Sequence, residues 1–462
     1  MNIPLNGRIA IVDDKIEQAQ PLMNVLAQKQ CPYSYYSGEL KYLPEEGNNS
    51  NDVRILFLDI NLIDDASHTQ KELKAKLVPV LSRIISKENY PYVLIYWSRH
   101  EDEYAKLVQE IFDNDLPDRK PIAFLSQNKL SYFKLDSERT DDFEQNVTNL
   151  FENISTLINS KLAYSYLVGW ENQVHKSTDK TLQEIFSACH SYESWSDNAN
   201  FLISKLGESY SGRSTYKNQS PEEKIKSSYQ SLNNVFIDTL EYSTNNYKLP
   251  NAGELSYSDD LINKEVIYSV NKKLLLSDDK EIMEYSGAVT EDINPKTDKA
   301  FEDLLNNAFN RKVIEDHVRQ KEENSKKEKR ELDKIINSES SIKRKEIRAS
   351  WKKIYCVTTP LCDYVQKKCY NIRVVKGMLI KAVNKEFIDE KSEAIFISPK
   401  FKFEDEIYVL VLHFRYFFTA ISSQGVKDLS PLFRIRQQLL AEVQSKLARH
   451  ISRQGVLFVD DI

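Results

Sequence analysis

Four side chains with carboxylate or hydroxyl groups follow short apolar segments in the first hundred residues of this 462-residue chain. They are Asp13, Asp14, Asp59 and Ser98. Carboxylates are ligands that Mg²⁺ prefers, and bound Mg²⁺ neutralises the charge on phosphoryl oxygens during transfer. If the fold brings these four side chains together, they form a strongly acidic pocket suited to a divalent cation and a phosphoryl group.

The segments that carry them have the pattern of buried strands. Each is apolar at every position up to its polar end, which is typical of a strand covered on both faces of a parallel sheet. The segments are residues 9–14, 56–59 and 94–98. Helical periodicity occurs in residues 15–30, 70–87 and 102–113, and residues 122–125 fit a fifth strand. We therefore expect a doubly wound α/β domain at residues 1–138, with the four side chains at the carboxyl edge of a five-stranded parallel sheet.

This N-terminal region resembles a response-regulator receiver domain, a flavodoxin-like module that accepts a phosphoryl group from a histidine kinase. The resemblance is carried by the acidic pair Asp13 and Asp14, by Asp59 and by Ser98. It implies that Asp59 is the phosphoacceptor, and that Mg²⁺ binds to the acidic pair, to Asp59 and to the backbone carbonyl of Asn61. It also implies that the Ser98 hydroxyl bonds a phosphoryl oxygen and couples the modification to the following loop.

The resemblance also requires a lysine after the fifth strand, as a cation for the same oxygens. Receivers carry Lys-Pro there, but Lys120-Pro121 of this chain precedes the predicted fifth strand. Lys129 follows the strand and is therefore the candidate for this role. The interval between Asp59 and Ser98 is longer than in the family. It predicts a longer helix between these two residues, where the family has its third helix. These departures leave open a degenerate receiver that keeps the fold without cycling phosphate.

The rest of the chain resembles no familiar output module. Residues 139–310 carry apolar stripes at helical spacing, and we expect a mainly α-helical domain there. Residues 311–353 are dense in Lys, Arg and Glu, which predicts a charged helical connector. We expect a small α+β domain at residues 354–462, ending in a basic amphipathic helix at residues 430–452. Its predicted strands are residues 355–358, 372–383, 394–397 and 407–418.

The composition, 41% hydrophobic and 29% charged, is typical of a soluble globular protein. The net charge of -6 gives no reason to expect nucleic acid or an anionic membrane as the main partner, although a local basic face leaves a nucleic-acid contact open. Five cysteines without a regular spacing favour a reducing compartment. The sequence contains no visible secretory signal or bilayer-spanning apolar segment, so we expect a cytoplasmic protein.

These observations favour a phosphorylation-responsive signalling protein over an enzyme, because no further catalytic constellation is visible. We expect a histidine kinase or a related ATPase sensor to phosphorylate Asp59, and the domain to relay the phosphoryl state to an unidentified effector or to buffer it. The alternative is a pseudo-receiver scaffold that binds a protein partner without phosphorylation, and a homo-oligomer remains open in either case. Large receiver-like proteins with unfamiliar C-terminal regions resemble components of bacterial stress and phage-defence systems, which implies the same setting here by analogy.

Overall fold

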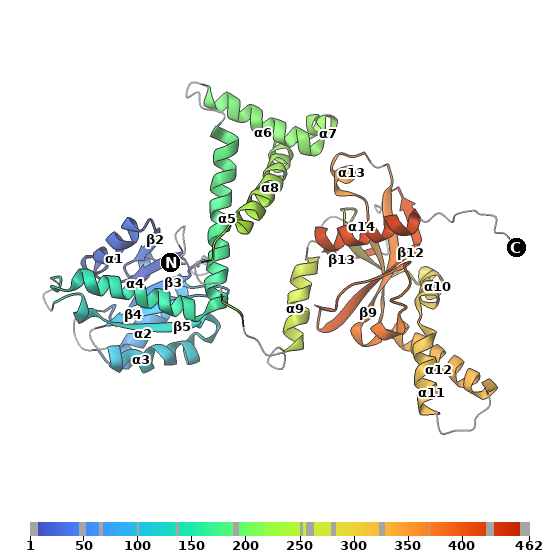
Figure 1. Cartoon of the computed structure of the whole chain (residues 1–462), viewed down its shortest axis with the longest axis horizontal. Helices are drawn as coiled ribbons and strands as arrows, with labels where there is room; N and C mark the ends of the chain where they lie inside the picture. The colour runs from blue at the N-terminus through green and yellow to red at the C-terminus, as the bar shows by residue number, and fades with distance from the viewer. Residues whose placement is uncertain are drawn as a thin grey trace. The chain divides into compact units, whose positions relative to one another are not determined.

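The computed structural model of the chain contains two compact units (Figure 1). The first comprises Met1–Leu202 and Gln230–Ser256, and the second comprises Ile203–Tyr229 and Tyr257–Ile462. The structure describes residues 8–45, 52–63, 68–98, 101–134, 138–187, 194–249, 253–255, 263–278, 283–322, 329–368, 370–421 and 429–452.

The first unit is built on a five-stranded sheet in which every strand runs parallel to its neighbours. The strands are β1 (Ile9–Val12), β2 (Tyr33–Tyr36), β3 (Ile55–Asp59), β4 (Val93–Ser98) and β5 (Ala123–Asn128). Their order across the sheet is β2-β1-β3-β4-β5. Strands β1 and β3 are buried along their whole length, as their continuous apolar sequence predicted. The predicted parallel sheet is therefore confirmed.

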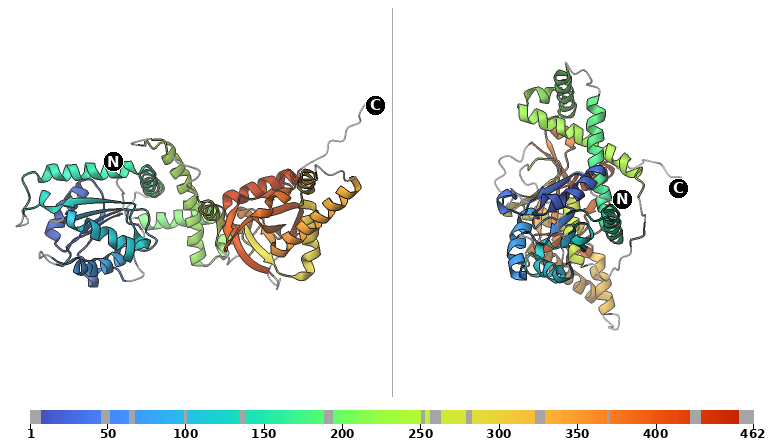
Figure 2. Two further views of the ribbon diagram at one scale, coloured as in Figure 1. Left: turned by 90° about the horizontal axis from the view of Figure 1, so that it is seen from below. Right: turned by 90° about the vertical axis from the view of Figure 1, so that its left-hand side faces the viewer.

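Helices cover both faces of this sheet. The helices are α1 (Ile16–Gln28), α2 (Gln70–Ile84), α3 (Glu101–Glu110) and α4 (Phe143–Ser160). Ile9 and Ile11 of β1 belong to the core shared with α1 and α4, whereas Ala10 and Val12 belong to the core shared with α2 and α3. This alternation follows from the period of two along a strand. In Figure 2 (left), the teal helix α4 lies on one side of the sheet and the blue-cyan helices α2 and α3 lie on the other.

Two strands differ from the sequence predictions. Strand β2 was not predicted, because its sequence Tyr-Ser-Tyr-Tyr forms a half-buried edge strand without a continuous apolar run. Strand β5 extends to Asn128 instead of ending at residue 125, because its pairing with β4 continues to Ser98. As a result, Lys129 follows the last residue of the strand directly.

Helix α2 begins where its sequence predicts and ends early. The Thr69 side chain accepts a hydrogen bond from the Glu72 backbone N–H, and the Glu72 carboxylate accepts one from the Thr69 N–H, which completes a capping box at the start of the helix. The helix then ends at Ile84, within the predicted range 70–87. The long interval between Asp59 and Ser98 therefore includes connecting segments on both sides of α2 rather than a helix of the predicted length.

The middle of the chain is helical, as predicted. Its helices are α5 (Leu162–Phe186), α6 (Trp195–Ser211), α7 (Arg213–Asn218) and α8 (Pro221–Asn245). Helix α5 is attached to the first sheet through Glu171, whose carboxylate lies 2.7 Å from Arg54 Nη2 and 3.5 Å from Arg8 Nη1. The Tyr164 hydroxyl adds a hydrogen bond to the Arg54 carbonyl at 2.5 Å. Because Arg8 precedes β1 and Arg54 precedes β3, these contacts hold α5 at the amino edge of the sheet.

The second unit contains a mainly antiparallel sheet. Its strands are β6 (Leu276–Ser277), β7 (Ala288–Asp292), β8 (Lys352–Val357), β9 (Ile372–Lys381), β10 (Ile395–Ile397), β11 (Phe401–Phe403), β12 (Glu406–Ala420) and β13 (Leu429–Ile435). The order is β10-β12-β9-β8-β7-β13-β6, and β11 pairs with β12. The predicted strands around residues 355, 372 and 407 are therefore present. Two further strands, β6 and β7, come from the range that the sequence had suggested to be helical.

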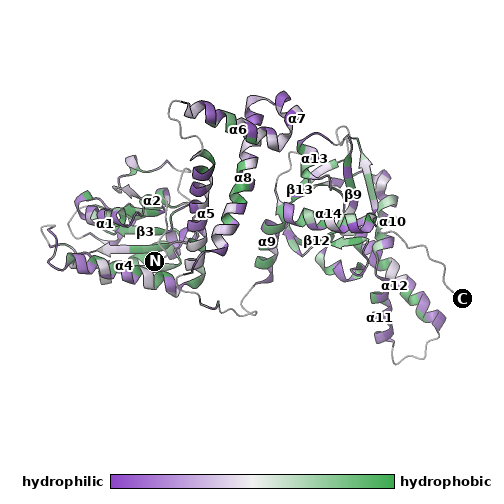
Figure 3. Ribbon diagram, turned by 45° about the horizontal axis from the view of Figure 1, so that its top comes forward, coloured by the Kyte–Doolittle hydropathy of each residue, from purple (hydrophilic) through white to green (hydrophobic). Residues whose placement is uncertain are grey.

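Helices pack on both faces of this second sheet. They are α9 (Lys264–Leu275), α10 (Asp298–Ala308), α11 (Arg311–Lys321), α12 (Lys329–Ser350), α13 (Leu361–Val365) and α14 (Gln437–Ile451). Leu440 and Val443 of α14 belong to one core cluster, and Phe301 of α10 with Ile347 of α12 belongs to another. Within the charged range 311–353, α11 and α12 are helical as predicted, whereas Lys352 and Lys353 belong to β8. Both helices contribute buried side chains, although much of their sequence is hydrophilic (Figure 3).

The predicted C-terminal helix at residues 430–452 is wrong at its beginning. Residues Leu429–Ile435 form strand β13, which pairs with β7, and the helix begins only at Gln437. Leu432 and Ile435 fit a helical stripe by spacing, but they are buried as part of a strand. A short apolar segment with this spacing is compatible with either element, and pairing with β7 decides between them.

Within the described ranges, no helix has the length and apolar character needed to cross a membrane.

Candidate functional site

The carboxyl ends of β1 and β3 place three acidic side chains together in the first unit. Asp13 directly follows β1, Asp14 is the next residue, and Asp59 is the last residue of β3. One carboxylate oxygen of each lies within 4.8 Å of the others. After β1 the chain continues to β2 on one side of the sheet, and after β3 it continues to β4 on the other side. In parallel sheets a ligand crevice opens between two strands whose connections diverge in this way. These three side chains could hold a metal ion there.

Short-range hydrogen bonds orient two of the carboxylates. Asp13 Oδ1 accepts a hydrogen bond from the Lys15 backbone N–H at 2.9 Å, and Asp59 Oδ1 accepts one from the Asn61 backbone N–H at 3.1 Å. Aspartate favours turns of this kind, in which the side chain binds the backbone two residues on. The Tyr35 hydroxyl also donates to the Asp13 carbonyl at 2.7 Å. The Oδ2 atoms of Asp13 and Asp59 make other contacts, both with Lys129.

Lys129 provides a buried cation between these Oδ2 atoms. Its Nζ atom lies 2.5 Å from Asp59 Oδ2 and 3.3 Å from Asp13 Oδ2, and it donates a hydrogen bond to Gln18 Oε1 at 2.7 Å. The lysine begins the short helical turn Lys129–Ser131, which is capped by the Asn128 side chain. Directly after β5, this turn carries the ammonium group from the edge of the sheet to the acidic cluster.

Burial dominates the electrostatics of the site. It raises the pKa of Asp59 from 3.8 to about 7, against the opposing charge of Lys129, and the Asp13 charge raises it further. Burial also raises the pKa of Asp13, again against Lys129. For Lys129, burial acts to lower the pKa, but the charges of Asp59 and Asp13 outweigh it and the pKa is raised. Lys129 is therefore a permanent cation that stabilises the ionised form of both aspartates.

The ligand atoms fit a divalent cation that prefers oxygen. Such cations are bound by a few carboxylates together with backbone carbonyls and water. Asp13 Oδ2 is buried and accepts no hydrogen bond from the residues that the structure describes, and the Lys129 ammonium lies 3.3 Å from it. A cation bound between Asp13, Asp14 and Asp59 would coordinate this oxygen in addition to its ion pair with Lys129. The arrangement therefore has the charge and the ligand atoms for a metal ion.

The structure brings together most of the residues predicted for this site. The carboxylates of Asp13, Asp14 and Asp59 lie together, Lys129 contacts Asp59, and the backbone of Asn61 donates a hydrogen bond to Asp59. The backbone of Ser98 ends β4 in register with Asn128, but the Ser98 side chain lies outside what the structure describes. The Lys120 of the Lys-Pro pair is elsewhere, exposed and 2.5 Å from Asp113. Of the two lysines considered, Lys129 is therefore the one that lies next to Asp59.

The sequence did not identify Gln18 and Trp97 as neighbours of Lys129. Gln18 is buried on α1 and accepts the hydrogen bond from Lys129. The available signal was a polar residue four positions before Leu22, on the apolar stripe of the helix. The Trp97 ring centroid lies 5.7 Å from Lys129 Nζ, so an aromatic face also flanks the cation.

Replacing Gln18 by leucine is expected to lower the free energy of unfolding of the first unit by about 1–3 kcal/mol. The reason is that the buried Lys129 ammonium would lose a hydrogen-bond acceptor that leucine, of similar size, cannot replace. Amide hydrogen exchange of β1 and α1 in the intact protein measures the change. Gln20→Leu, on the exposed side of the same helix, is the matched control and should change the free energy by less than about 0.5 kcal/mol. Equal effects of the two substitutions would contradict this role of Gln18.

The interpretation of this site depends on its own geometry. The acidic cluster, the buried lysine and the position at the carboxyl ends of β1 and β3 are the observations that any function must explain. Protein-family models, curated proteins and solved structures were all compared with the chain, and none of them matches it significantly.

Proposed function

We propose that the first unit is a receiver domain with a flavodoxin-like fold, which accepts a phosphoryl group on Asp59 in the presence of Mg²⁺. The observation that carries this proposal is the pairing of Asp59 with Lys129 at 2.5 Å, beside the acidic pair Asp13 and Asp14. The strand order β2-β1-β3-β4-β5 supports it, because doubly wound sheets of this order bind phosphate-bearing ligands where β1 and β3 meet.

Each residue has a defined part in the proposed transfer. A carboxylate oxygen of Asp59 forms a bond to phosphorus while the bond from phosphorus to the donor breaks, and the donor leaves with the electron pair. Lys129 provides a cation for the phosphoryl oxygens, and its charge opposes the rise that burial causes in the pKa of Asp59. Asp13, Asp14, Asp59 and the Asn61 carbonyl are the proposed Mg²⁺ ligands, and the metal ion supplies charge neutralisation on the phosphoryl oxygens. The Ser98 hydroxyl is the proposed partner of one of those oxygens.

In this proposal the protein is a cytoplasmic component of bacterial stress or phage-defence signalling. The phosphoryl donor is a phosphohistidine on a histidine kinase or a related ATPase sensor. The added negative charge changes the surface around β4 and β5, and an effector protein detects that change or the domain stores the phosphoryl group. The chemistry requires only that the donor reaches Asp59, so a small acyl phosphate can replace the kinase in a test.

The test is Mg²⁺-dependent phosphorylation of the purified full chain by acetyl phosphate, followed by intact mass spectrometry. We expect one added phosphoryl group in the wild type, none with EDTA, and none in Asp59→Asn. Asp113→Asn, which removes an exposed carboxylate of the same unit that also pairs with a lysine, should be phosphorylated like the wild type. Retention of the adduct in Asp59→Asn, or its formation in EDTA, would contradict the proposed site.

A pseudo-receiver scaffold is the second candidate, and the burial of the acidic cluster favours it. Asp59 is only 3% exposed, and the Lys129 ammonium contacts both Asp59 and Asp13. In such a domain, the ion pairs of Lys129 with Asp13 and Asp59 would stabilise the sheet, and a protein partner would bind at another surface. Absence of an acetyl phosphate adduct, together with absence of Mg²⁺ and beryllofluoride binding by calorimetry, would select the scaffold over the phosphorylated receiver.

A further inference from the structure

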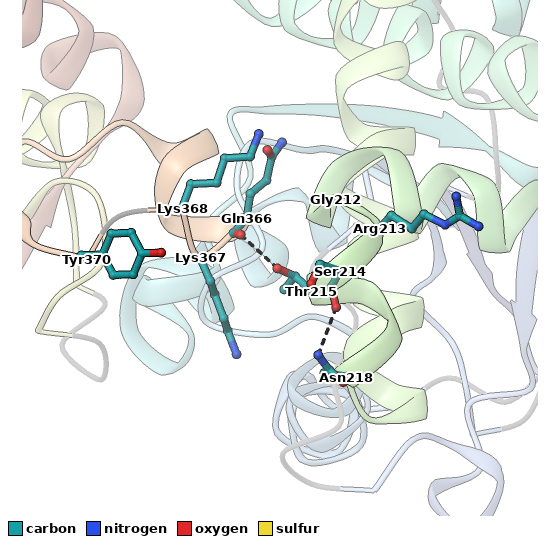
Figure 4. A pocket seen from close by; sticks show the side chains of 9 residues that line it. All are labelled: Gly212, Arg213, Ser214, Thr215, Asn218, Gln366, Lys367, Lys368 and Tyr370. Atoms are coloured by element: carbon teal, nitrogen blue, oxygen red, sulfur yellow. Dashed lines mark hydrogen bonds between the residues drawn. The ribbon is translucent and has the colours of Figure 1, made fainter.

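The second unit contains a cavity of about 590 Å³ that belongs to neither core (Figure 4). One wall is formed by α7 and the preceding Gly212, and the other by Gln366, Lys367, Lys368 and Tyr370, which follow α13. The Thr215 hydroxyl donates a hydrogen bond to the Gln366 carbonyl at 3.0 Å, which joins the two walls. The volume falls within the range of small-molecule binding sites in proteins.

The lining of this cavity is cationic. It includes Arg213, Lys367 and Lys368, and no carboxylate is among its lining residues. The chain as a whole carries a net charge of -6, so a cavity of this kind does not follow from composition. A second cavity of the same unit, of about 360 Å³, provides the comparison, because its three lysines are matched by three acidic residues. Those residues are Lys381, Lys400, Lys402, Glu265, Asp405 and Glu406.

Two carboxylates near the cationic cavity in sequence, Glu208 and Glu223, do not line it, but each interacts with one of its cations. Glu208 lies 2.6 Å from Lys205, and its second oxygen is 3.6 Å from Arg213 Nε. The Glu223 carboxylate accepts a hydrogen bond from the Ser220 backbone N–H at 2.7 Å, at the start of α8. Neither Lys367 nor Lys368 forms an ion pair within the part of the chain that the structure describes, although the Lys367 charge adds to the hydrogen bonds from Ser220 that lower the pKa of Glu223. The cavity therefore retains positive charge that an anionic ligand could neutralise.

The arrangement of the cations indicates the shape of such a ligand. Lys367 and Lys368 extend in opposite directions from their turn, and the Arg213 side chain on the other wall points away from both, so the three charged groups do not converge on one point (Figure 4). A single phosphate ion could contact only part of this set, whereas a chain of phosphates could extend along it. Tyr370, which is 94% exposed, adds an aromatic face at the same cavity on which a base could stack.

We propose that this cavity binds a small molecule that carries a polyphosphate chain. Arg213, Lys367 and Lys368 contact the phosphate oxygens. The Ser214 hydroxyl and the Asn218 amide, which also line the cavity, are polar groups beside them. The shared chemistry is the polyphosphate, and its source is either a nucleoside triphosphate or inorganic triphosphate. Tyr370 distinguishes the two, because only the nucleotide has a ring that can stack on it.

The test is titration of the full chain with ATP and, separately, with inorganic triphosphate, by isothermal titration calorimetry without divalent cations. We expect saturable binding that Lys367→Glu and Lys368→Glu each weaken by about tenfold or more, since each reverses a charge at the phosphates. Lys400→Glu is the matched control, because it makes the same charge change in the balanced cavity and should leave the affinity unchanged. All three lysines lie on the surface, so these variants retain the fold.

The Tyr370→Ala variant separates the two sources of the polyphosphate. Weaker binding of ATP with unchanged binding of inorganic triphosphate identifies a nucleotide ligand, whereas unchanged binding of both identifies inorganic polyphosphate. The proposal is overturned if neither compound binds. It is also overturned if Lys400→Glu weakens binding as much as the substitutions at Lys367 and Lys368.

Discussion

Replacing Lys129 by methionine is expected to lower the free energy of unfolding of the first unit by about 3–5 kcal/mol at pH 8. The Lys129 ammonium is buried and lies 2.5 Å from Asp59 and 3.3 Å from Asp13, so its removal leaves two buried carboxylates without a cation. Methionine keeps the length of the apolar stem and removes the charge. At pH 5 the loss should be smaller, because the unpaired carboxyl groups take up protons and become neutral.

Amide hydrogen exchange of β1 and β3 in the intact protein measures this loss locally. Lys120→Met is the matched control, since Lys120 also lies 2.5 Å from an aspartate, Asp113, but on the surface. It should change the free energy by less than about 1 kcal/mol. If Lys129→Met alone does not fold, the double variant with Asp59→Asn should recover much of the lost stability. A change at Lys129 no larger than that at Lys120 would contradict a buried ionic role for Lys129.

Lowering the pH from 8 to 5 without divalent cations is expected to stabilise the first unit, with a contribution from Asp59 of about 3 kcal/mol. The pKa of Asp59 is raised by burial from 3.8 to about 7 in the folded state. Between pH 3.8 and about pH 7, Asp59 is therefore protonated in the folded protein and ionised in the unfolded chain. Stability from this group is present at low pH and is lost as the pH rises toward 7. Asp13, whose pKa is also raised by burial, acts in the same direction.

Hydrogen exchange at both pH values, corrected for the intrinsic exchange rates, tests the pH dependence in β1 and β3. Asp59→Asn should remove most of it, because asparagine does not titrate. The second unit provides an internal contrast: burial lowers the pKa of His413 from 6.5 to about 4, with the charges of Arg415 and His450 adding to the effect. That group reduces the stability of β12 as the pH falls below 6.5. A first unit that is equally stable at pH 5 and pH 8 would contradict the raised pKa of Asp59.

The strands of the first sheet show which features a sequence can reveal. Strands β1 and β3 were predicted because burial on both faces leaves a continuous apolar run, and the position of Asp13 and Asp59 at their carboxyl ends then follows from parallel pairing. Strand β2 was missed because a half-buried edge strand of Tyr and Ser has no such pattern. Residues 430–435 were misassigned to a helix because their apolar spacing suits both elements, and only pairing with β7 favours the strand.

The sequence by itself determined the parallel sheet and the convergence of Asp13, Asp14 and Asp59, because local pattern and strand direction are sufficient for both. Only the tertiary structure decided how the cluster is neutralised. Gln18 and Lys129 are separated by 111 positions, and their hydrogen bond depends on where α1 and the turn after β5 meet. The raised pKa of Asp59 was likewise decided by burial, a property of the packed fold. The cationic cavity joins Thr215 to Gln366, 151 positions apart, and no local pattern in either segment specifies that contact.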